Sequence, residues 1–412
     1  MSTVSTGRPA APTSTTTTRP PAPPSRGRRS SSRWGERNGV GWLFVAPTVL
    51  VLGLFLFVPI VMALWVSFSD WNGRGSPFSG SVGFVGLDNY AQLLTEGGLT
   101  RQDFMTSLRN NFYYVLMVVP LQTALALFLA VVLNQQLLKA RGFFRTAFYF
   151  PSVTSSVAIS IVFLFLFTGS GVVNELLSFI GIDGPTWFAD PRGLLHLLGD
   201  TVGVWDLGSP PTALTGTSIL GLSAWQWLAG PSVALSVIIL LVVWTTTGTF
   251  LLMFLAALQD VPAEVEEAAV MDGASRWQSF RAVTLPHLRP TTLLVITLGV
   301  IGTWQVFDQV YVMTQGGPSK TTLTPAYLSY EYAFVSQKWG VAAAMAFVLF
   351  LIIFVLTSFQ RWLFRDKDAV AEKRAARRTQ RQLRDDSVRT RAGTDVPTAV
   401  STRGSDLPGG AR

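Results

Sequence analysis

The stretch from Pro231 to Leu258, PSVALSVIILLVVWTTTGTFLLMFLAAL, decides the fold because it is long, apolar and free of charged residues. A helix needs about 20 apolar residues to cross the hydrocarbon core of a bilayer. Backbone polar groups find no water in that core, so a spanning segment must be a helix or part of a closed barrel. Barrel strands would be shorter and would alternate in polarity. The stretch therefore predicts a transmembrane helix.

Five further stretches of similar length and composition flank this one. Among the six, only the fifth holds a charged residue, Asp308. Together they predict an all-α integral membrane helical bundle of about six transmembrane helices. The other five stretches are 43–67, 112–133, 146–168, 291–313 and 340–359.

The composition supports a chain whose solvent is largely lipid. Of the 412 residues, 49% are hydrophobic and 14% are charged, whereas a soluble domain carries roughly a quarter charged residues. The absence of cysteine excludes disulfides and thiolate metal sites. The two histidines, His196 and His287, lie too far apart in sequence to form a pair at metal-ligand spacing.

Basic residues are concentrated at the two ends of the chain. The formal net charge of +8 would suggest a nucleic-acid partner for a soluble protein. Here residues 1–41 and 365–412 are charged tails poor in large apolar residues, which predicts disorder. Cytoplasmic segments of membrane proteins are enriched in Lys and Arg. We therefore expect a multi-pass protein of the plasma (inner) membrane with both termini cytoplasmic, and no nucleic-acid partner.

Two loops give the same orientation. The link between the second and third spans carries Lys139, Arg141 and Arg145 and no acid, as expected inside the cell. The segment 169–230 carries five acids against Arg192 alone and is expected outside. Its part 214–229 is too rich in threonine and serine for a seventh span, which favours a surface helix or a re-entrant piece.

A cleaved signal peptide is the alternative interpretation of the first span. Its apolar run is too long for a signal sequence, and no clear small-x-small cleavage site follows it. A transmembrane helix is favoured.

Between the fourth and fifth spans lies a polar segment, 259–287, QDVPAEVEEAAVMDGASRWQSFRAVTLPH. Pro262 suits a helix start, and the glutamates after it favour the positive end of the helix dipole. Gly273 can adopt the left-handed conformation that ends a helix. Ser275 and Gln278 form a capping box for a second helix, which Leu285–Pro286 would close.

These two short helices could rest on lipid headgroups or bind a protein. Trp277 and Phe280 are large apolar groups on a segment expected in water, which suits either surface. Five acids against three arginines between Asp260 and Arg289 would be repelled by anionic headgroups. A protein partner is favoured.

At this point the sequence resembles a known family, the permease subunits of binding-protein-dependent carbohydrate ABC importers of the maltose and glycerol-phosphate type. Glu267–Ala269, Asp272–Ala274 and Leu285–Pro286 resemble their coupling-loop motif. The stretch FDQVYVMTQGGP, 307–318, resembles the signature of the carbohydrate branch, as do Tyr332–Phe334 and the Gly340 region. The resemblance covers 42–364 and implies a type I ABC importer permease domain, with 169–230 as an external loop that contains extra length from about Pro191.

The resemblance implies a subunit that hydrolyses nothing itself. No lysine follows the glycine of a phosphate-binding loop, so ATP and magnesium are expected on a separate ATPase and no cofactor on this chain. The implied partners are a second permease subunit in a heterodimer, two ATP-binding subunits and an extracytoplasmic solute-binding protein. The residues expected to couple to the ATPase are Glu264, Glu267, Ala268, Ala269, Asp272, Gly273, Leu285 and Pro286.

The fifth span carries the candidate substrate path. A continuous helix places Asp308 roughly 26 Å beyond Thr291, toward the external side. Aromatic faces beside amide or carboxylate acceptors suit sugars, although such aromatics can also anchor a span at the membrane interface. The path candidates are Trp244, Trp304, Gln305, Asp308 and Tyr311.

Other functions remain as alternatives. A permease for glycerol phosphate or a peptide is the nearest, but a phosphorylated solute favours cavity-facing arginines, and the spans contain none. A stand-alone secondary transporter would need ionisable residues within the membrane, where Asp308 is the single candidate. A membrane enzyme comes last, because no histidine–carboxylate cluster or activated nucleophile is visible on the spans.

Overall fold

The computed structural model describes residues 38–135 and 140–364. The predicted disordered tails lie outside these residues, except that the helix of the first span already begins at Asn38. Lys139, in the link between the second and third spans, also lies outside them. The described chain divides into two compact units, one ending at Val61 and the other beginning at Met62.

The described part of the first unit, from Asn38 on, is helical. It contains α1 (Asn38–Leu52), the π-helical turn η1 (Gly53–Phe57) and the start of α2 (Val58–Ser67). Together α1, η1 and α2 give one candidate span, Gly41–Ser67. The predicted first transmembrane helix is thus present as a helix of membrane-spanning length.

Four more candidate spans lie in the second unit. They are α4 (Leu99–Asn134), α11 (Val233–Gln259), α15 (Arg289–Trp304) continued by α16 (Asp308–Met313), and α18 (Trp339–Leu363). With Gly41–Ser67 this makes five spans in the described chain, or six when one bent helix pair is counted. The prediction of about six is confirmed.

The third predicted span is the bent pair. Instead of one helix over 146–168, the chain forms α5 (Arg141–Val153) and α6 (Ser156–Leu166), which meet at 97°. Pro151 cannot donate a backbone hydrogen bond, and Thr154 and Ser155 adopt extended or other non-helical conformations at the corner. The third span is therefore a broken helix, and apolar composition does not predict the angle of the bend, because an apolar run has the same composition whether it is straight or bent.

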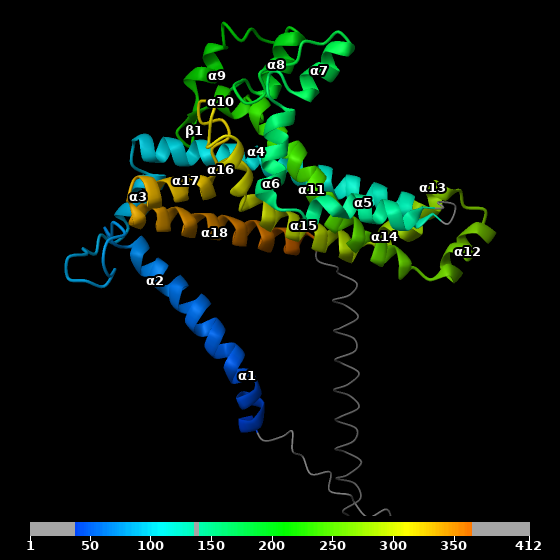
Figure 1. Ribbon diagram of the computed structural model, residues 1–412, viewed down its shortest axis with the longest axis horizontal. Coiled ribbons are helices and arrows are strands. Elements are labelled where there is room, and N and C mark those ends of the chain that lie inside the picture. The colour runs from blue at the N-terminus through cyan, green and yellow to red at the C-terminus, as the bar shows by residue number, and fades with distance from the viewer. Residues whose placement is uncertain (1–37, 136–139, 365–412) are drawn as a thin grey trace, which may run out of the picture. The chain divides into compact units, whose positions relative to one another are not determined.

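The core is organised around α11, which packs against α4, α5 and α15 (Figure 1). In its most apolar stretch 61% of the residues are buried, against 33% in α4 and 39% in α18. Leu235, Ile238 and Leu241 join the larger core cluster, and Leu251 and Phe254 join a second one. The other helices therefore keep broad apolar faces free for lipid or for partner subunits.

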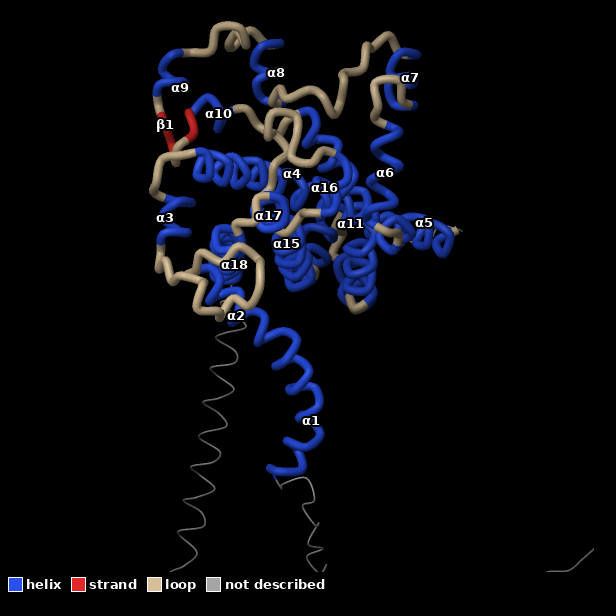
Figure 2. The backbone as a smooth tube through the Cα atoms, turned by 60° about the vertical axis from the view of Figure 1, so that its left-hand side comes forward, coloured by secondary structure: helices blue, strands red, loops and turns tan. Residues whose placement is uncertain are grey.

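The predicted external segment, 169–230, is not an unstructured loop, although about half of it lies outside helices and strands. It contains four short helices and one β-hairpin, whose strands are the only ones drawn in red among the described residues (Figure 2). Strand β1 (Ser218–Ile219) pairs antiparallel with β2 (Leu222–Ser223) through a two-residue turn. Both turn residues, Leu220 and Gly221, have positive φ, as the twist of a tight hairpin requires. Region 214–229 forms no span, which confirms that expectation. The helices are α7 (Val172–Phe179), α8 (Leu194–Thr201), α9 (Thr212–Gly216) and α10 (Ala224–Leu228).

The remaining elements are short. On one side of the bundle α3 and α17 pack near the start of α18, and on the other the polar segment forms α12 to α14 (Figure 1). Their bounds are α3 (Asp88–Leu94), α12 (Ala263–Met271), α13 (Arg276–Ser279), η2 (Phe280–Thr284), α14 (Leu285–His287), α17 (Pro325–Tyr330) and η3 (Glu331–Val335).

Candidate coupling loop and solute cavity

The polar segment between α11 and α15 folds as its local sequence predicts. Helix α12 begins directly after Pro262, and Gly273 follows its end with a φ of +75°. In the capping box the Ser275 backbone N–H donates to Gln278 Oε1 at 2.8 Å, and the Gln278 N–H donates to Ser275 Oγ at 3.3 Å. The two-helix prediction is confirmed.

The end of this segment differs from the expectation. Leu285–Pro286 does not close the second helix, because the helical path continues from α13 through the π-helical turn η2 into α14. Pro286 follows the π-helical turn within this continuous path, as the second residue of α14. Leu288, the residue between α14 and α15, is fully buried in the second core cluster and anchors the start of α15.

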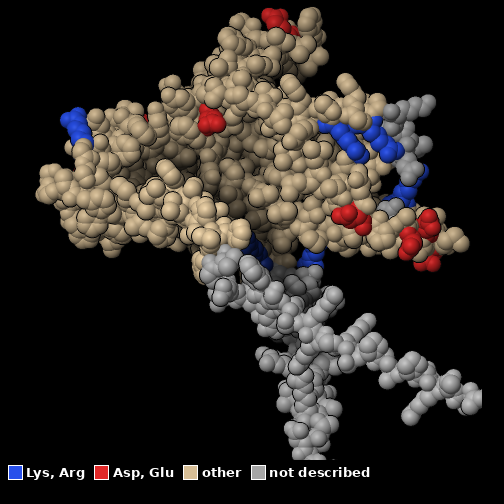
Figure 3. Space-filling model, turned by 60° about the horizontal axis from the view of Figure 1, so that its bottom comes forward, with Lys and Arg blue, Asp and Glu red and all other residues tan. Residues whose placement is uncertain are grey.

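Helix α12 and the turn after it expose a mixed acidic and apolar surface. Met271 is 86% exposed, and Val270 and Trp277 are 67% and 68% exposed. Trp277 stacks on Phe280 at a ring-centroid distance of 5.6 Å. Acidic side chains gather at this end of the molecule, with basic ones beside them (Figure 3). Such exposed apolar groups, rimmed by charge, are typical of a protein-binding surface.

Six of the predicted coupling residues lie on α12 and the turn after it, whereas Leu285 and Pro286 lie on α14. The exposed ones are Glu264, Glu267, Ala268, Asp272, Gly273, Leu285 and Pro286, and Ala269 is half-buried. The segment from Pro262 to Gly273 forms a single short helical element, because Pro262 precedes the helix at one end and the left-handed glycine follows it at the other.

The second candidate site is a cavity of about 300 Å³ between α4, α11 and the interruption that separates α15 from α16. The span predicted as one helix is interrupted at 305–307, so Asp308 is the first residue of α16 and not part of a continuous helix. Phe307 at φ −135° and Gln305 at φ −101° leave the helical conformation. The polar groups of Gln305 and Asp308 thereby come to line the cavity.

The other three predicted path residues lie elsewhere. Trp304 is 5% exposed and packs with Leu349 and Ile353 of α18. Trp244 is 46% exposed and its ring lies 5.8 Å from that of Phe163, outside the lining of the cavity. Tyr311 is 42% exposed and belongs to an aromatic cluster next to the cavity.

That aromatic cluster extends from the cavity wall. Phe307 lines the cavity and stacks on Tyr311 at 5.4 Å. Tyr330 lies edge-on to both rings at 5.3 and 5.4 Å, and Tyr327 lies 6.3 Å from Phe307. Sequence analysis identified Tyr311 but missed its partners in α17, which packing alone brings beside α16.

Sequence analysis identified Gln305 but missed four other uncharged polar residues of the cavity. Gln122 of α4, Thr246 of α11 and Thr303 of α15 line it together with Gln309. Gln309 Nε2 donates to Ser156 Oγ of α6 at 2.9 Å. Gln309 and Thr246 also line a neighbouring cavity of about 150 Å³ at the α5–α6 bend. A glutamine inside an otherwise apolar span was the available signal for Gln122 and Gln309, but it was used only for Gln305.

The described lining of the cavity carries a single acidic side chain. Asp308 is the one ionisable carboxylate among the described residues that line it, and Lys and Arg are absent from that lining. The remaining polar groups are amides and hydroxyls, which both donate and accept hydrogen bonds. The wall therefore suits a neutral, hydroxyl-rich solute and disfavours an anion.

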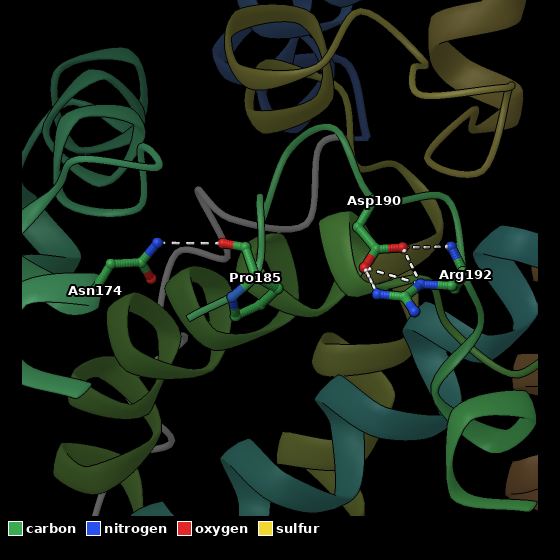
Figure 4. Close-up of polar contacts among 4 residues, drawn as sticks. All are labelled: Asn174, Pro185, Asp190 and Arg192. Carbon is green, nitrogen blue, oxygen red and sulfur yellow. Dashed lines mark hydrogen bonds and ion pairs between the residues drawn. The ribbon is translucent and has the colours of Figure 1, made fainter. Parts of the chain in front are cut away.

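The segment 169–230 is held by polar contacts (Figure 4). Arg192 makes a bidentate pair with Asp190, with Nη2 to Oδ2 at 2.7 Å and Nε to Oδ1 at 3.0 Å. This hydrogen-bonded guanidinium holds the pKa of Asp190 below its ordinary value. Asn174 Nδ2 donates to the Pro185 carbonyl at 3.2 Å.

A histidine and the nearby aromatics order the outer part of the same segment. His196 stacks on Trp225 at 3.9 Å, and burial lowers the pKa of its imidazole. Trp205 Nε1 donates to the His196 carbonyl at 3.1 Å. These contacts join α8 to α10 and explain why the predicted loop is a folded unit.

Comparison with known proteins agrees with this architecture. Residues 110–368 match the family described as binding-protein-dependent transport system inner membrane component. The lactose transport system permease protein LacF of Rhizobium radiobacter is 32% identical over 343 residues, which cover 82% of this chain and 98% of the relative. The arabinooligosaccharides transport system permease protein AraP of Halalkalibacterium halodurans is 31% identical, covering 81% of this chain and 92% of the relative.

A solved structure shares the fold. A chain of a bacterial ABC transporter involved in the import of the acidic polysaccharide alginate superposes with a TM-score of 0.58 at 20% identity, over 80% of this chain and 96% of that one. The fold is therefore the type I permease fold expected from the resemblance. The family match covers more than half of the chain, and this protein belongs to the inner membrane components of binding-protein-dependent transport systems.

Proposed function

We propose that this chain is the permease subunit of an ABC importer for a neutral sugar or oligosaccharide, and that α12 couples it to a separate ATPase. The observation that carries the proposal is the exposed lever from Pro262 to Gly273, which sits at one end of a bundle whose interior holds a polar cavity. An exposed helix that a partner can move, together with a solute cavity in the same chain, suits a transport subunit driven by a separate ATPase.

In the proposed assembly, this permease pairs with a second one to form the path, and two ATP-binding subunits hold ATP and magnesium. An extracytoplasmic solute-binding protein delivers the solute. The basic tails and α12 face the cytoplasm, and the unit 169–230 faces outward, in keeping with the enrichment of Lys and Arg inside. Tails 1–41 and 365–412 flank the permease domain.

The coupling step follows from the exposed chemistry. Met271, Val270 and Trp277 enter an apolar cleft of the ATPase, and Glu264 and Glu267 make charge-assisted hydrogen bonds at its rim. Closure of the ATPase dimer on ATP then moves α12 as a rigid body. Because α12 is joined to α11, this motion biases the bundle between two states that open to opposite sides.

The solute class follows from the cavity. LacF and AraP are named for lactose and arabinooligosaccharides, which are neutral, whereas the alginate importer is named for an acidic polysaccharide. An uncompensated carboxylate, Asp308, with amides and hydroxyls around it favours the neutral class. It also disfavours glycerol phosphate.

The test is reconstitution of this chain in liposomes with the partner permease, ATPase and binding protein of the proposed assembly. Uptake of labelled lactose, maltotriose and arabinotriose is compared with uptake of glycerol 3-phosphate and an alginate trisaccharide. ATP-dependent uptake of at least one neutral sugar, without the anions, is expected. Uptake in the absence of the ATPase, or uptake of the anions alone, would refute the proposal.

A further inference from the structure

The side chain of Gln122 is fully buried on the wall of the solute cavity, yet half of its amide has no partner among the described residues. The Thr246 hydroxyl lies 2.6 Å from Gln122 Oε1, so this end of the amide is paired across α4 and α11. The other end, Nε2, is a buried atom without a hydrogen bond in the described chain. An unpaired buried donor is costly, so such groups are rare and call for a reason.

Turning the amide over does not remove the problem. The Thr246 hydroxyl has one proton to donate. Its oxygen, Oγ1, also lies 2.7 Å from the Val242 carbonyl oxygen, which can accept that proton in place of Gln122. In the turned orientation Nε2 would donate to Thr246 Oγ1, and Oε1 would become the atom without a partner. One amide atom of Gln122 is therefore unpaired in either orientation, and we refer to it as the free amide end.

The free amide end lies over a glycine that makes room for it. A Cβ built on Gly299 would stand 2.5 Å from Gln122 Nε2. Gly299 lines the same cavity, so the amide lies where α4, α11 and α15 meet the cavity wall. Any larger residue at 299 would displace the amide.

We propose that the free amide end of Gln122 binds a hydroxyl group of the transported solute. A hydroxyl both donates and accepts, so it satisfies either orientation of the amide. A site built to hydrogen-bond a hydroxyl discriminates strongly against solutes that lack one. The inference rests on the proposed function, because it takes the cavity to be the solute path, and it names Gln122 as a specificity-determining residue of that path.

The chain supplies a matched control for the test. Gln360 of α18 is also a buried glutamine paired with a threonine, with Nε2 donating to Thr297 Oγ1 at 3.0 Å. It joins two helices as Gln122 does, but it does not line the cavity. Gln122→Leu and Gln360→Leu therefore each remove one interhelical hydrogen bond. Gln122→Leu alone also removes the free amide end.

The assay measures uptake by the complete reconstituted assembly, using lactose, maltotriose and arabinotriose as probes. Gln122→Leu is expected to raise KM for the transported sugar about three- to tenfold, the effect of one lost hydrogen bond, with Gln360→Leu close to wild type. Equal effects of the two variants on KM, or an unchanged KM in Gln122→Leu, would overturn the inference. Wild-type assembly that transports none of the sugars would instead count against the proposed function.

A second pair of variants moves the amide without removing it. Gly299→Ala pushes the flexible end of Gln122 aside, whereas Gly302→Ala adds the same methyl group to the same cavity with no atom within 4 Å. Gly299→Ala should raise KM in the direction of Gln122→Leu, and Gly302→Ala should not. A rise confined to Gly302→Ala would show that cavity volume and not the amide limits binding, and would refute the proposal.

Discussion

Gly248 of α11 lies directly against the backbone of Phe148 in α5: a Cβ on Gly248 would stand 2.3 Å from the Phe148 carbonyl oxygen. Tyr149 Cα would be 2.9 Å away. The contact joins the central helix to the bent pair, which also borders the smaller cavity. A rigid backbone cannot yield as a flexible side chain can, so this helix crossing depends on the absence of a side chain.

We expect Gly248→Ala to destabilise the bundle by about 1–3 kcal/mol, the usual cost of overpacking. Gly142→Ala is the control, because it adds a methyl group to α5 itself with no atom within 4 Å. Thermal unfolding in detergent should show a lowered Tm for Gly248→Ala alone. An unchanged Tm would mean that α5 and α11 separate readily at this crossing.

Gly273 is the second position where we expect a larger residue to impair the protein, here because of the backbone conformation. Its φ of +75° costs a β-branched residue about 1–2 kcal/mol or more. Gly273→Val should tilt α12 and abolish sugar-dependent stimulation of ATP hydrolysis while the protein still inserts in the membrane. Asparagine tolerates this conformation, so Gly273→Asn should keep most of the stimulation. Normal uptake by Gly273→Val would contradict the lever role.

We expect the exposed side chain of Met271, at the end of α12, to be needed for binding the ATPase. Met271→Asp places a charge at a position that is 86% exposed, so it should fold normally but lose copurification with the ATPase. Val202→Asp is the control, because Val202 is 76% exposed on the external unit. Loss of the ATPase in both variants would indicate a general defect, and retention in Met271→Asp would argue against docking through α12.

The Asp190–Arg192 pair should stabilise the external unit in a pH-dependent manner. Because the pKa of Asp190 is lowered in the folded state, its stabilising contribution is present above the unfolded pKa of about 3.9 and is lost as pH falls through the lower folded value. Arg192 is 55% exposed, so the pair contributes no more than about 1 kcal/mol.

Hydrogen exchange of the amides near Asp190 measures this effect. Asp190→Asn should exchange faster than wild type at pH 7, after correction for intrinsic rates, and the difference should shrink as pH falls below about 4. Asp183→Asn removes the same charge from an exposed position and should leave the exchange unchanged. A difference between Asp190→Asn and wild type that persists at low pH would point to a role other than ion pairing.

Much of the architecture could be read from local sequence. Apolar length predicted the spans, and Pro262, Gly273 and the Ser275–Gln278 box predicted the coupling helices closely, because caps and left-handed glycines act within a few residues. The size of the bend at Thr154–Ser155 and the interruption at 305–307 were not predicted, since apolar composition does not distinguish a continuous helix from an interrupted one.

The sequence by itself determined that this chain crosses a membrane as helices and carries a polar segment of two short helices between its fourth and fifth spans. Both properties follow from runs of neighbouring residues, through hydrophobic burial and backbone hydrogen bonding. Only the tertiary structure decided which polar groups share the cavity. Gln122, Thr246 and Gly299 come from three separate helices, and their meeting depends on how α4, α11 and α15 pack, which no local pattern encodes.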